Sequence, residues 1–248
     1  MTADINSLYR APELYDAEFG AYRADVAFYE NVLRRHPGRV VELGCGTGRL
    51  HLLLSPPDYV GVDRERAMLA RFQRRWLRPP PPLVNAELAA LPLAGGSARV
   101  VILAYNLLQH LMDPPALTRA LREAGRVAGP DGVVALDTFM PPWPGSERHD
   151  DDFCFSEQRR HPDGSIMEVA EQTSMDAGGV QVTRLRFAPR GGGEAVVHDV
   201  VRRLWGADEL LGALTAAGLA RLWLWGDVDG SAFDARSPRF MACCAPVA

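Results

Sequence analysis

Short apolar segments alternate with amphipathic segments along the first half of the chain. Clusters of β-branched and apolar residues predict strands, and apolar residues recurring every three or four positions predict helices. The predicted strands are 39–43, 59–62, 83–84, 100–104 and 133–137. The predicted helices are 49–54, 66–77 and 114–128, preceded by an amphipathic helical segment over 12–36 with a break near Gly20. Strands that alternate with helices in this way indicate βαβ units and a mainly parallel sheet.

The pattern changes after residue 138. Polar and apolar positions alternate over 152–158, 166–175, 180–187 and 195–205, and glycine-rich turns separate these segments, which predicts four antiparallel strands. A helix over 208–217 and strands over 219–225 and 239–244 follow. We therefore expect an α/β fold whose Rossmann-like, seven-stranded core is formed by residues 1–138 and 206–248. Residues 139–205 are expected to form an antiparallel β insertion after the fifth strand, where a lid over a binding cleft belongs.

Composition and charge narrow the classes of partner. The 248 residues carry a formal charge of −4, and the sequence contains no lysine, so its 27 basic residues are all arginine. A nucleic-acid partner would require a clustered basic face, which the sequence does not show. No apolar run approaches the roughly 20 residues needed to cross a bilayer, and the acidic start lacks the pattern of a secretory signal. We expect a cytoplasmic protein that binds neither membrane nor nucleic acid.

The four cysteines are not spaced as a disulfide framework or a metal site. Cys45, Cys154, Cys243 and Cys244 include no C-x-x-C pair. We expect them to be reduced thiols, as is usual in a reducing compartment, and we expect no metal.

A glycine-rich turn after the first strand is the most informative segment. Glu42 precedes three alternate glycines, Gly44, Gly46 and Gly48. Glycines are needed where the backbone takes positive φ and where a ligand lies against bare backbone. A dinucleotide fingerprint, G-x-G-x-x-G, would place glycine at the position of Arg49. The turn therefore favours a nucleotide-like ligand other than a dinucleotide.

The pattern E-x-G-x-G-x-G resembles motif I of the class I S-adenosylmethionine-dependent methyltransferases. The resemblance continues through Tyr59–Asp63, through 85–93, which is similar to the family's "GDA-x-x-LPF" segment, and through 104–110, which is similar to motif IV. It covers nearly the whole chain and implies that the cofactor is S-adenosyl-L-methionine. By this resemblance the cofactor-binding residues are Tyr15, Glu42, Gly44, Cys45, Gly46, Gly48, Asp63, Arg64, Met68, Glu87, Leu88 and Tyr105.

Individual roles follow from the same resemblance. Asp63 ends the second strand, where the family's acid accepts both ribose hydroxyls, and Met68 matches the residue that packs on the adenine. Glu87 stands where the family usually has Asp. Tyr15 and Asp16 match a "YD" helix that closes over the cofactor.

The antiparallel insertion resembles that of glycine N-methyltransferases and of aminosugar N-methyltransferases from antibiotic pathways. Such enzymes act on small polar molecules, so the expected reaction is methyl transfer to an N or O atom by in-line displacement. Our candidate for a catalytic base is His110, with His149 beside an acidic run as a further candidate. The residues expected to bind the acceptor are Asn106, Trp143, His198 and Arg203.

Two other functions remain open at the level of sequence. One is a non-catalytic protein that binds S-adenosylmethionine or S-adenosylhomocysteine, and the other is an NAD-dependent oxidoreductase, which Arg49 disfavours. The sequence does not determine the acceptor, the atom methylated, the number of transfers or whether the chain is a homodimer.

Overall fold

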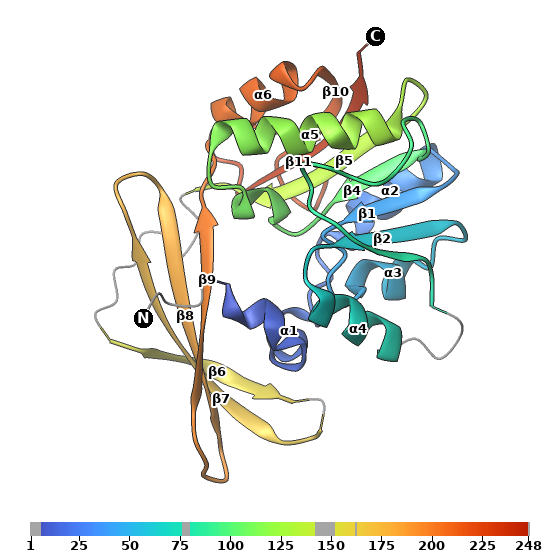
Figure 1. Cartoon of the computed structure of the whole chain (residues 1–248). Coiled ribbons are helices and arrows are strands. Elements are labelled where there is room, and N and C mark those ends of the chain that lie inside the picture. The colour runs from blue at the N-terminus through green and yellow to red at the C-terminus, as the bar shows by residue number, and fades with distance from the viewer. Residues whose placement is uncertain (1–5, 76–79, 142–151, 162, 248) are drawn as a thin grey trace.

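Two β-sheets organise the protein, whose computed structural model describes residues 6–75, 80–141, 152–161 and 163–247 (Figure 1). Seven strands form the larger sheet in the order β10-β11-β5-β4-β1-β2-β3, and four form a second sheet in the order β6-β7-β8-β9. The predicted Rossmann-like, seven-stranded α/β fold with an antiparallel insertion after the fifth strand is confirmed.

The larger sheet is parallel except at one edge. Its strands are β1 (Val40–Leu43), β2 (Tyr59–Asp63), β3 (Leu83–Asn85), β4 (Val100–Leu103), β5 (Val133–Phe139), β10 (Leu219–Trp225) and β11 (Arg239–Pro246). β11 runs antiparallel to both β5 and β10. β5 extends two residues beyond its predicted end because β11 pairs with it as far as Phe139.

Helices cover both faces of this sheet. The helices of the described residues are α1 (Pro12–Phe19), α2 (Val26–Arg35), α3 (Arg49–Leu54), α4 (Arg66–Arg75), α5 (Pro114–Ala128) and α6 (Ala207–Ala216), with 3-10 turns η1 (Ser7–Arg10) and η2 (Leu107–His110). Apolar side chains of α2, α3 and α4 pack against one face, and those of α5 and α6 against the other. In the described part of the chain, no helix has the length and apolar character required to cross a membrane.

Strand alternation assigns each buried side chain to one of these two layers. On β11, Met241 and Cys243 pack with α2, whereas Phe240 and Cys244 pack with α5 and α6. The cysteines are free thiols, and burial raises the pKa of Cys243 and of Cys244 to about 12. Buried thiols of this kind behave as small apolar residues.

The predicted helical segment 12–36 is divided at Gly20. α1 ends before this glycine, and Arg23 Nη1 donates hydrogen bonds of 2.8 Å to the carbonyl oxygens of Gly20 and Tyr22. These bonds satisfy carbonyl groups that a helix end leaves unpaired. The break lets α2 pack on the core sheet while α1 lies between α4 and the small sheet, as Figure 1 shows.

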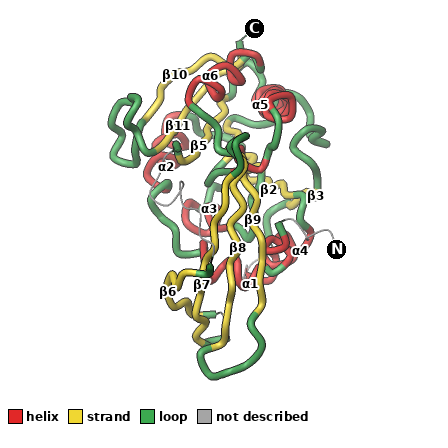
Figure 2. Tube along the Cα trace, turned by 90° about the vertical axis from the view of Figure 1, so that its left-hand side faces the viewer, coloured by secondary structure: helices red, strands yellow, loops and turns green. Residues whose placement is uncertain are grey.

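The small sheet is antiparallel and extends away from the core (Figure 2). Its strands are β6 (Cys154–Arg160), β7 (Ile166–Met175), β8 (Val180–Pro189) and β9 (Val196–Arg203). The N-terminal segment docks on the free edge of β9, where the N–H of Val201 donates to Asn6 Oδ1 at 2.8 Å. Backbone groups at the edge of a sheet need such partners where they are shielded from water.

Candidate active site

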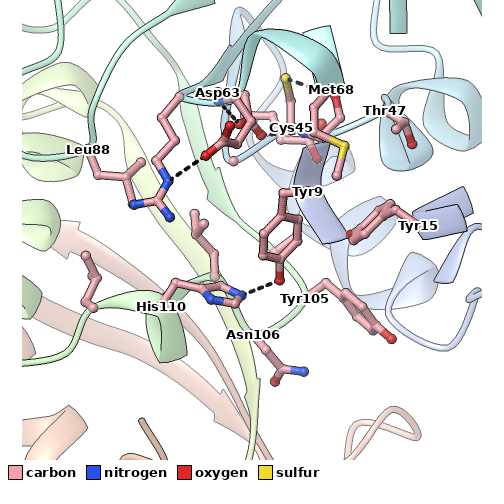
Figure 3. A pocket seen from close by; sticks show the side chains of 18 of the residues that line it. Tyr9, Tyr15, Cys45, Thr47, Asp63, Met68, Leu88, Tyr105, Asn106 and His110 are labelled. Carbon is pink, nitrogen blue, oxygen red and sulfur yellow. Dashed lines mark hydrogen bonds and ion pairs between the residues drawn. The ribbon is translucent and has the colours of Figure 1, made fainter. Parts of the chain in front are cut away.

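A cavity of about 310 Å³ lies at the carboxyl ends of β1, β2 and β4 and reaches β9 (Figure 3). This volume is at the lower end of the range of small-molecule sites. The predicted site residues that line it are Tyr15, Glu42, Gly44, Cys45, Gly46, Asp63, Arg64, Met68, Glu87, Leu88, Tyr105, Asn106 and His110.

The glycine turn forms one wall of the cavity. Gly44, Gly46 and Gly48 have φ of 64°, 56° and 83°, so all three use the conformation that glycine permits. A Cβ added at Gly46 would meet no atom within 4 Å, which leaves bare backbone open to a ligand. Gly48 differs: a Cβ there would lie 2.5 Å from the ring of Phe72, and this glycine does not line the cavity. The close approach of Phe72 therefore explains Gly48, and its predicted contact with the ligand stays a prediction.

Two carboxyl groups adjoin this turn, the half-buried Asp63 and the buried Glu42. Asp63 Oδ2 accepts a hydrogen bond of 2.8 Å from the N–H of Gly46, and Oδ1 accepts one of 2.8 Å from the N–H of Glu65. Glu42 Oε2 accepts a 2.6 Å bond from the Tyr59 hydroxyl, and burial raises the pKa of Glu42 to about 7. Burial also raises the pKa of Asp63, against the effect of its two N–H donors.

Aromatic side chains line the opposite wall. The ring centroids of Tyr9 and Tyr15 are 5.6 Å apart, those of Tyr15 and Phe19 5.2 Å, and those of Phe19 and Tyr105 5.9 Å. Burial raises the pKa of Tyr105 to about 12 and that of the other two phenols as well, so all three are neutral at pH 7. Such ring faces attract cations.

His110 and Tyr9 are joined directly by a hydrogen bond (Figure 3). The distance from Tyr9 Oη to His110 Nε2 is 2.8 Å, and His110 Nδ1 lies 3.2 Å from the carbonyl oxygen of Val201. A carbonyl oxygen only accepts, so Nδ1 carries the proton and Nε2 accepts the Tyr9 hydroxyl. Burial, together with Arg202 and Arg64, lowers the pKa of His110 to about 3, so the ring is neutral at pH 7.

The chain enters η2 through two residues with positive φ, Tyr105 (52°) and Asn106 (64°). Asp137 Oδ1 accepts hydrogen bonds from the N–H of Tyr105 at 2.8 Å and from the Tyr29 hydroxyl at 2.6 Å. Asn106 Oδ1 accepts from the N–H of Phe139 at 2.7 Å. Strained backbone of this kind persists where surrounding groups hold it and concentrates at functional sites.

The described residues contain no cluster of His, Cys, Asp or Glu suited to a metal ion.

Comparisons with known proteins agree with this geometry. Residues 40–132 match the family profile described as a methyltransferase domain. The chain carries a methyltransferase domain. A malonyl-[acyl-carrier protein] O-methyltransferase from Halorhodospira halophila is 42% identical over 116 residues, which cover 44% of this chain. The match spans only 37% of that relative's length.

Solved structures share the fold of the whole chain. An S-adenosylmethionine-dependent methyltransferase from Clostridium acetobutylicum has a TM-score of 0.78 at 14% identity, over 98% of this chain and 100% of that one. The sugar N-methyltransferase KedS8 from Streptoalloteichus has a TM-score of 0.72 at 22% identity, over 95% and 92%. At these identities the likeness concerns the fold. The predicted class I methyltransferase fold is confirmed.

The cavity residues of this methyltransferase domain fit S-adenosylmethionine, the cofactor of its class. Gly46 leaves bare backbone, Asp63 offers a carboxylate to ribose hydroxyls, and Met68 contributes apolar surface for an adenine ring. Tyr9 and Tyr105 provide ring faces for a sulfonium cation.

Of the residues predicted to bind the acceptor, two do not line the cavity and a third lies outside the described residues. His198 does not line the cavity, because its Nδ1 lies 3.1 Å from Ser7 Oγ beneath η1. Arg203 points away from it and donates at 3.1 Å to Met112 O and to Glu209 Oε1. Trp143 lies outside the described residues, as does His149.

Several residues of the cavity wall are not among those predicted from the sequence, namely Tyr9, Phe19, Thr47, Arg49, Val200 and Arg202. The alternation within β9 offered a signal for the last two. His198, Val200 and Arg202 share one face of the strand, so a prediction that includes His198 should pair it with Arg202 rather than with Arg203. Tyr9 had no comparable signal, because it precedes the predicted helical segment and carries no motif.

Proposed function

We propose that this chain is an enzyme that transfers a methyl group from S-adenosylmethionine to an N or O atom of a small polar acceptor. The observation that supports this most directly is the cavity, which joins a nucleoside-binding wall to the hydrogen-bonded pair Tyr9 and His110. The printed functions of the relatives, an O-methyltransferase and a sugar N-methyltransferase, agree with either acceptor atom.

The residues around the acceptor act mainly by orientation. When bound, S-adenosylmethionine supplies a methyl group already activated by its sulfonium. His110 Nε2 accepts the hydrogen bond of the Tyr9 hydroxyl. The lone pairs of the Tyr9 oxygen are therefore free to accept a hydrogen bond from an N–H or O–H group of the methyl acceptor. Correct alignment of two reactants can lower a barrier by roughly 7–11 kcal/mol. His110 therefore serves to position Tyr9, and its low pKa keeps it from carrying a competing positive charge.

The cofactor assignment is tested by calorimetric titration with S-adenosylhomocysteine, with NAD as the competing ligand. We expect binding of S-adenosylhomocysteine alone. Asp63→Asn should weaken it by about 1.5–3 kcal/mol, the cost of a hydrogen bond to a charged group. The matched control is Asp58→Asn, because Asp58 is an exposed acid that precedes β2 and pairs with Arg39. Equal affinity in both variants, or binding of NAD, would refute the assignment.

Turnover is tested separately by measuring S-adenosylhomocysteine released from S-adenosylmethionine with panels of amines, aminosugars, phenols and carboxylic acids. Release that depends on one acceptor supports the enzyme. Tight cofactor binding without turnover of any acceptor would instead favour a non-catalytic binding protein.

A further inference from the structure

Arg202 brings a guanidinium group to the cavity wall from β9. Its Nη2 donates hydrogen bonds to Gln181 Oε1 at 3.0 Å and to Thr183 Oγ1 at 3.1 Å. Its Nε is buried and has no hydrogen-bond partner. Both partners are neutral, and no carboxylate of the described residues forms an ion pair with Arg202.

The other arginines of the cavity wall are compensated. Arg49 Nη2 lies 2.5 Å from Asp25 Oδ2, and Arg64 Nε lies 3.6 Å from Glu65 Oε1. Among the arginines that line the cavity, Arg202 is therefore the one without a carboxylate partner in the described residues.

An uncompensated cation with a desolvated, unpaired N–H group is costly in a folded protein. Burial lowers the pKa of Arg202, against smaller effects of Tyr9, Tyr105 and Glu171 in the opposite direction. A buried charge is normally paired with an opposite charge, because its lost hydration must be replaced. A ligand that carries a negative group would supply the missing partner.

The position of Arg202 indicates which ligand this is. Its charge acts on Tyr9, Tyr105 and His110, which surround the acceptor end of the cavity. Asp63 and Gly46, which we assign to the nucleoside, lie at the glycine turn.

We propose that Arg202 binds an anionic oxygen group of the methyl acceptor, a carboxylate or a phosphate, through the guanidinium hydrogens that Gln181 and Thr183 do not use. The inference rests on the proposed function, since its ligand is the acceptor of methyl transfer. A planar guanidinium pairs with two oxygens of such a group at once. The acceptors of this enzyme are accordingly small anionic molecules.

The test measures binding of two probe anions, malonate and inorganic phosphate, to the protein saturated with S-adenosylhomocysteine. Thermal melting is followed during titration at constant ionic strength, with malonamide as the neutral probe. The variants are Arg202→Gln, Arg202→Lys and Arg184→Gln. Arg184 is the matched control because it lies on β8 on the opposite face, 3.5 Å from Asp199, and its removal changes the net charge equally.

We expect malonate or phosphate, but not malonamide, to raise the melting temperature of the wild-type protein and of Arg184→Gln. Arg202→Gln should weaken the apparent affinity for the anion by about tenfold or more. The anion affinity of Arg202→Lys, which keeps the charge without the planar guanidinium, should lie between those of the wild type and of Arg202→Gln. If Arg202→Gln does not fold, the lysine variant against the wild type decides the question.

Calorimetry with S-adenosylhomocysteine on the same variants separates this inference from the function that it presupposes. Failure of the wild-type protein to bind S-adenosylhomocysteine would refute the proposed function. Normal cofactor binding with no saturable effect of either anion, or with equal effects in Arg202→Gln, would overturn the role of Arg202. A loss of S-adenosylhomocysteine affinity in Arg202→Gln would also overturn it, because Arg202 would then bind the cofactor's own carboxylate.

Discussion

The hydroxyl of Thr47 donates a hydrogen bond of 2.6 Å to Asp16 Oδ1, which joins helix α1 to the turn that lines the cavity. Arg71 Nε and Arg75 Nη1, both on α4, donate to the same carboxylate at 2.9 and 2.8 Å. Asp16 thus receives three donors and fixes α1 across the cavity, where Tyr15 forms part of the wall.

Replacing Asp16 by alanine should release α1. The loss leaves the two arginines without a common acceptor and should lower the free energy of unfolding by about 1–3 kcal/mol. Hydrogen exchange of the amides in Pro12–Phe19 should accelerate, and affinity for S-adenosylhomocysteine should fall. Glu13→Ala is the control: Glu13 lies on the same helix but is more exposed, and its ion pairs with Arg71 and Arg74 are longer, at 3.5 and 3.6 Å. Equal exchange in the two variants would contradict this role of Asp16.

The two glycines at the turn should respond differently to alanine. Gly46→Ala places a methyl group in open space beside the cavity and should weaken binding of S-adenosylhomocysteine. Its backbone strain should lower the free energy of unfolding by about 1–2 kcal/mol. Gly48→Ala must also displace Phe72, which adds about 1–3 kcal/mol of overpacking. Urea denaturation and calorimetry on both variants check this order. A Gly46→Ala protein that binds like the wild type would exclude Gly46 from the ligand site.

His110 should remain neutral in mildly acidic solution, because its pKa is about 3 in the folded state. Nitrogen chemical shifts of labelled histidine should show a protonated Nδ1 and an unprotonated Nε2 at pH 5. In Tyr9→Phe the Nε2 signal should move, since its donor is lost.

The unfolded histidine takes up a proton near pH 6.5. The contribution of neutral His110 to stability is therefore complete above about pH 6.5 and decreases as the pH falls toward 3. A His110 signal that titrates between pH 6 and 7 would show that the imidazole is not held as described.

Glu42 should have the opposite pH dependence. Burial raises its pKa from 4.5 to about 7, so the folded state binds a proton that the unfolded state has released. The wild-type protein should lose stability, relative to Glu42→Gln, as the pH rises from about 4.5 to about 7, by roughly 3 kcal/mol in total. Glutamine still accepts the Tyr59 hydroxyl. Denaturation at several pH values measures the difference, and a difference that does not change with pH would disprove the linkage.

Local patterns were sufficient to predict most elements of the fold. Helix α5 begins at the predicted residue because Asp113 accepts the N–H of Ala116 at 2.7 Å and Pro114, which has no N–H, needs no acceptor. The positive φ of Gly44 and Gly46 follows from the glycine spacing, and Asp63 lies at the end of its strand as expected. These features depend on neighbours within a few residues in the sequence.

The acceptor end of the cavity was decided by contacts between distant segments. Tyr9 meets His110 across 101 positions, and Asn6 meets Val201 across 195. No periodicity in the sequence encodes these pairs. They form because the free edge of β9 needs hydrogen-bond partners and the N-terminal segment supplies them.

The sequence by itself therefore determined the seven-stranded fold, the glycine turn and the class of cofactor, since each depends on strand and helix periodicity or on one continuous motif. Only the tertiary structure decided that Tyr9 and Arg202, rather than His198 and Arg203, line the cavity. Strand alternation limits a side chain to one of two faces, but the packing of the second sheet against η1 and η2 determines which face meets the cavity and which positions along it remain open to the ligand.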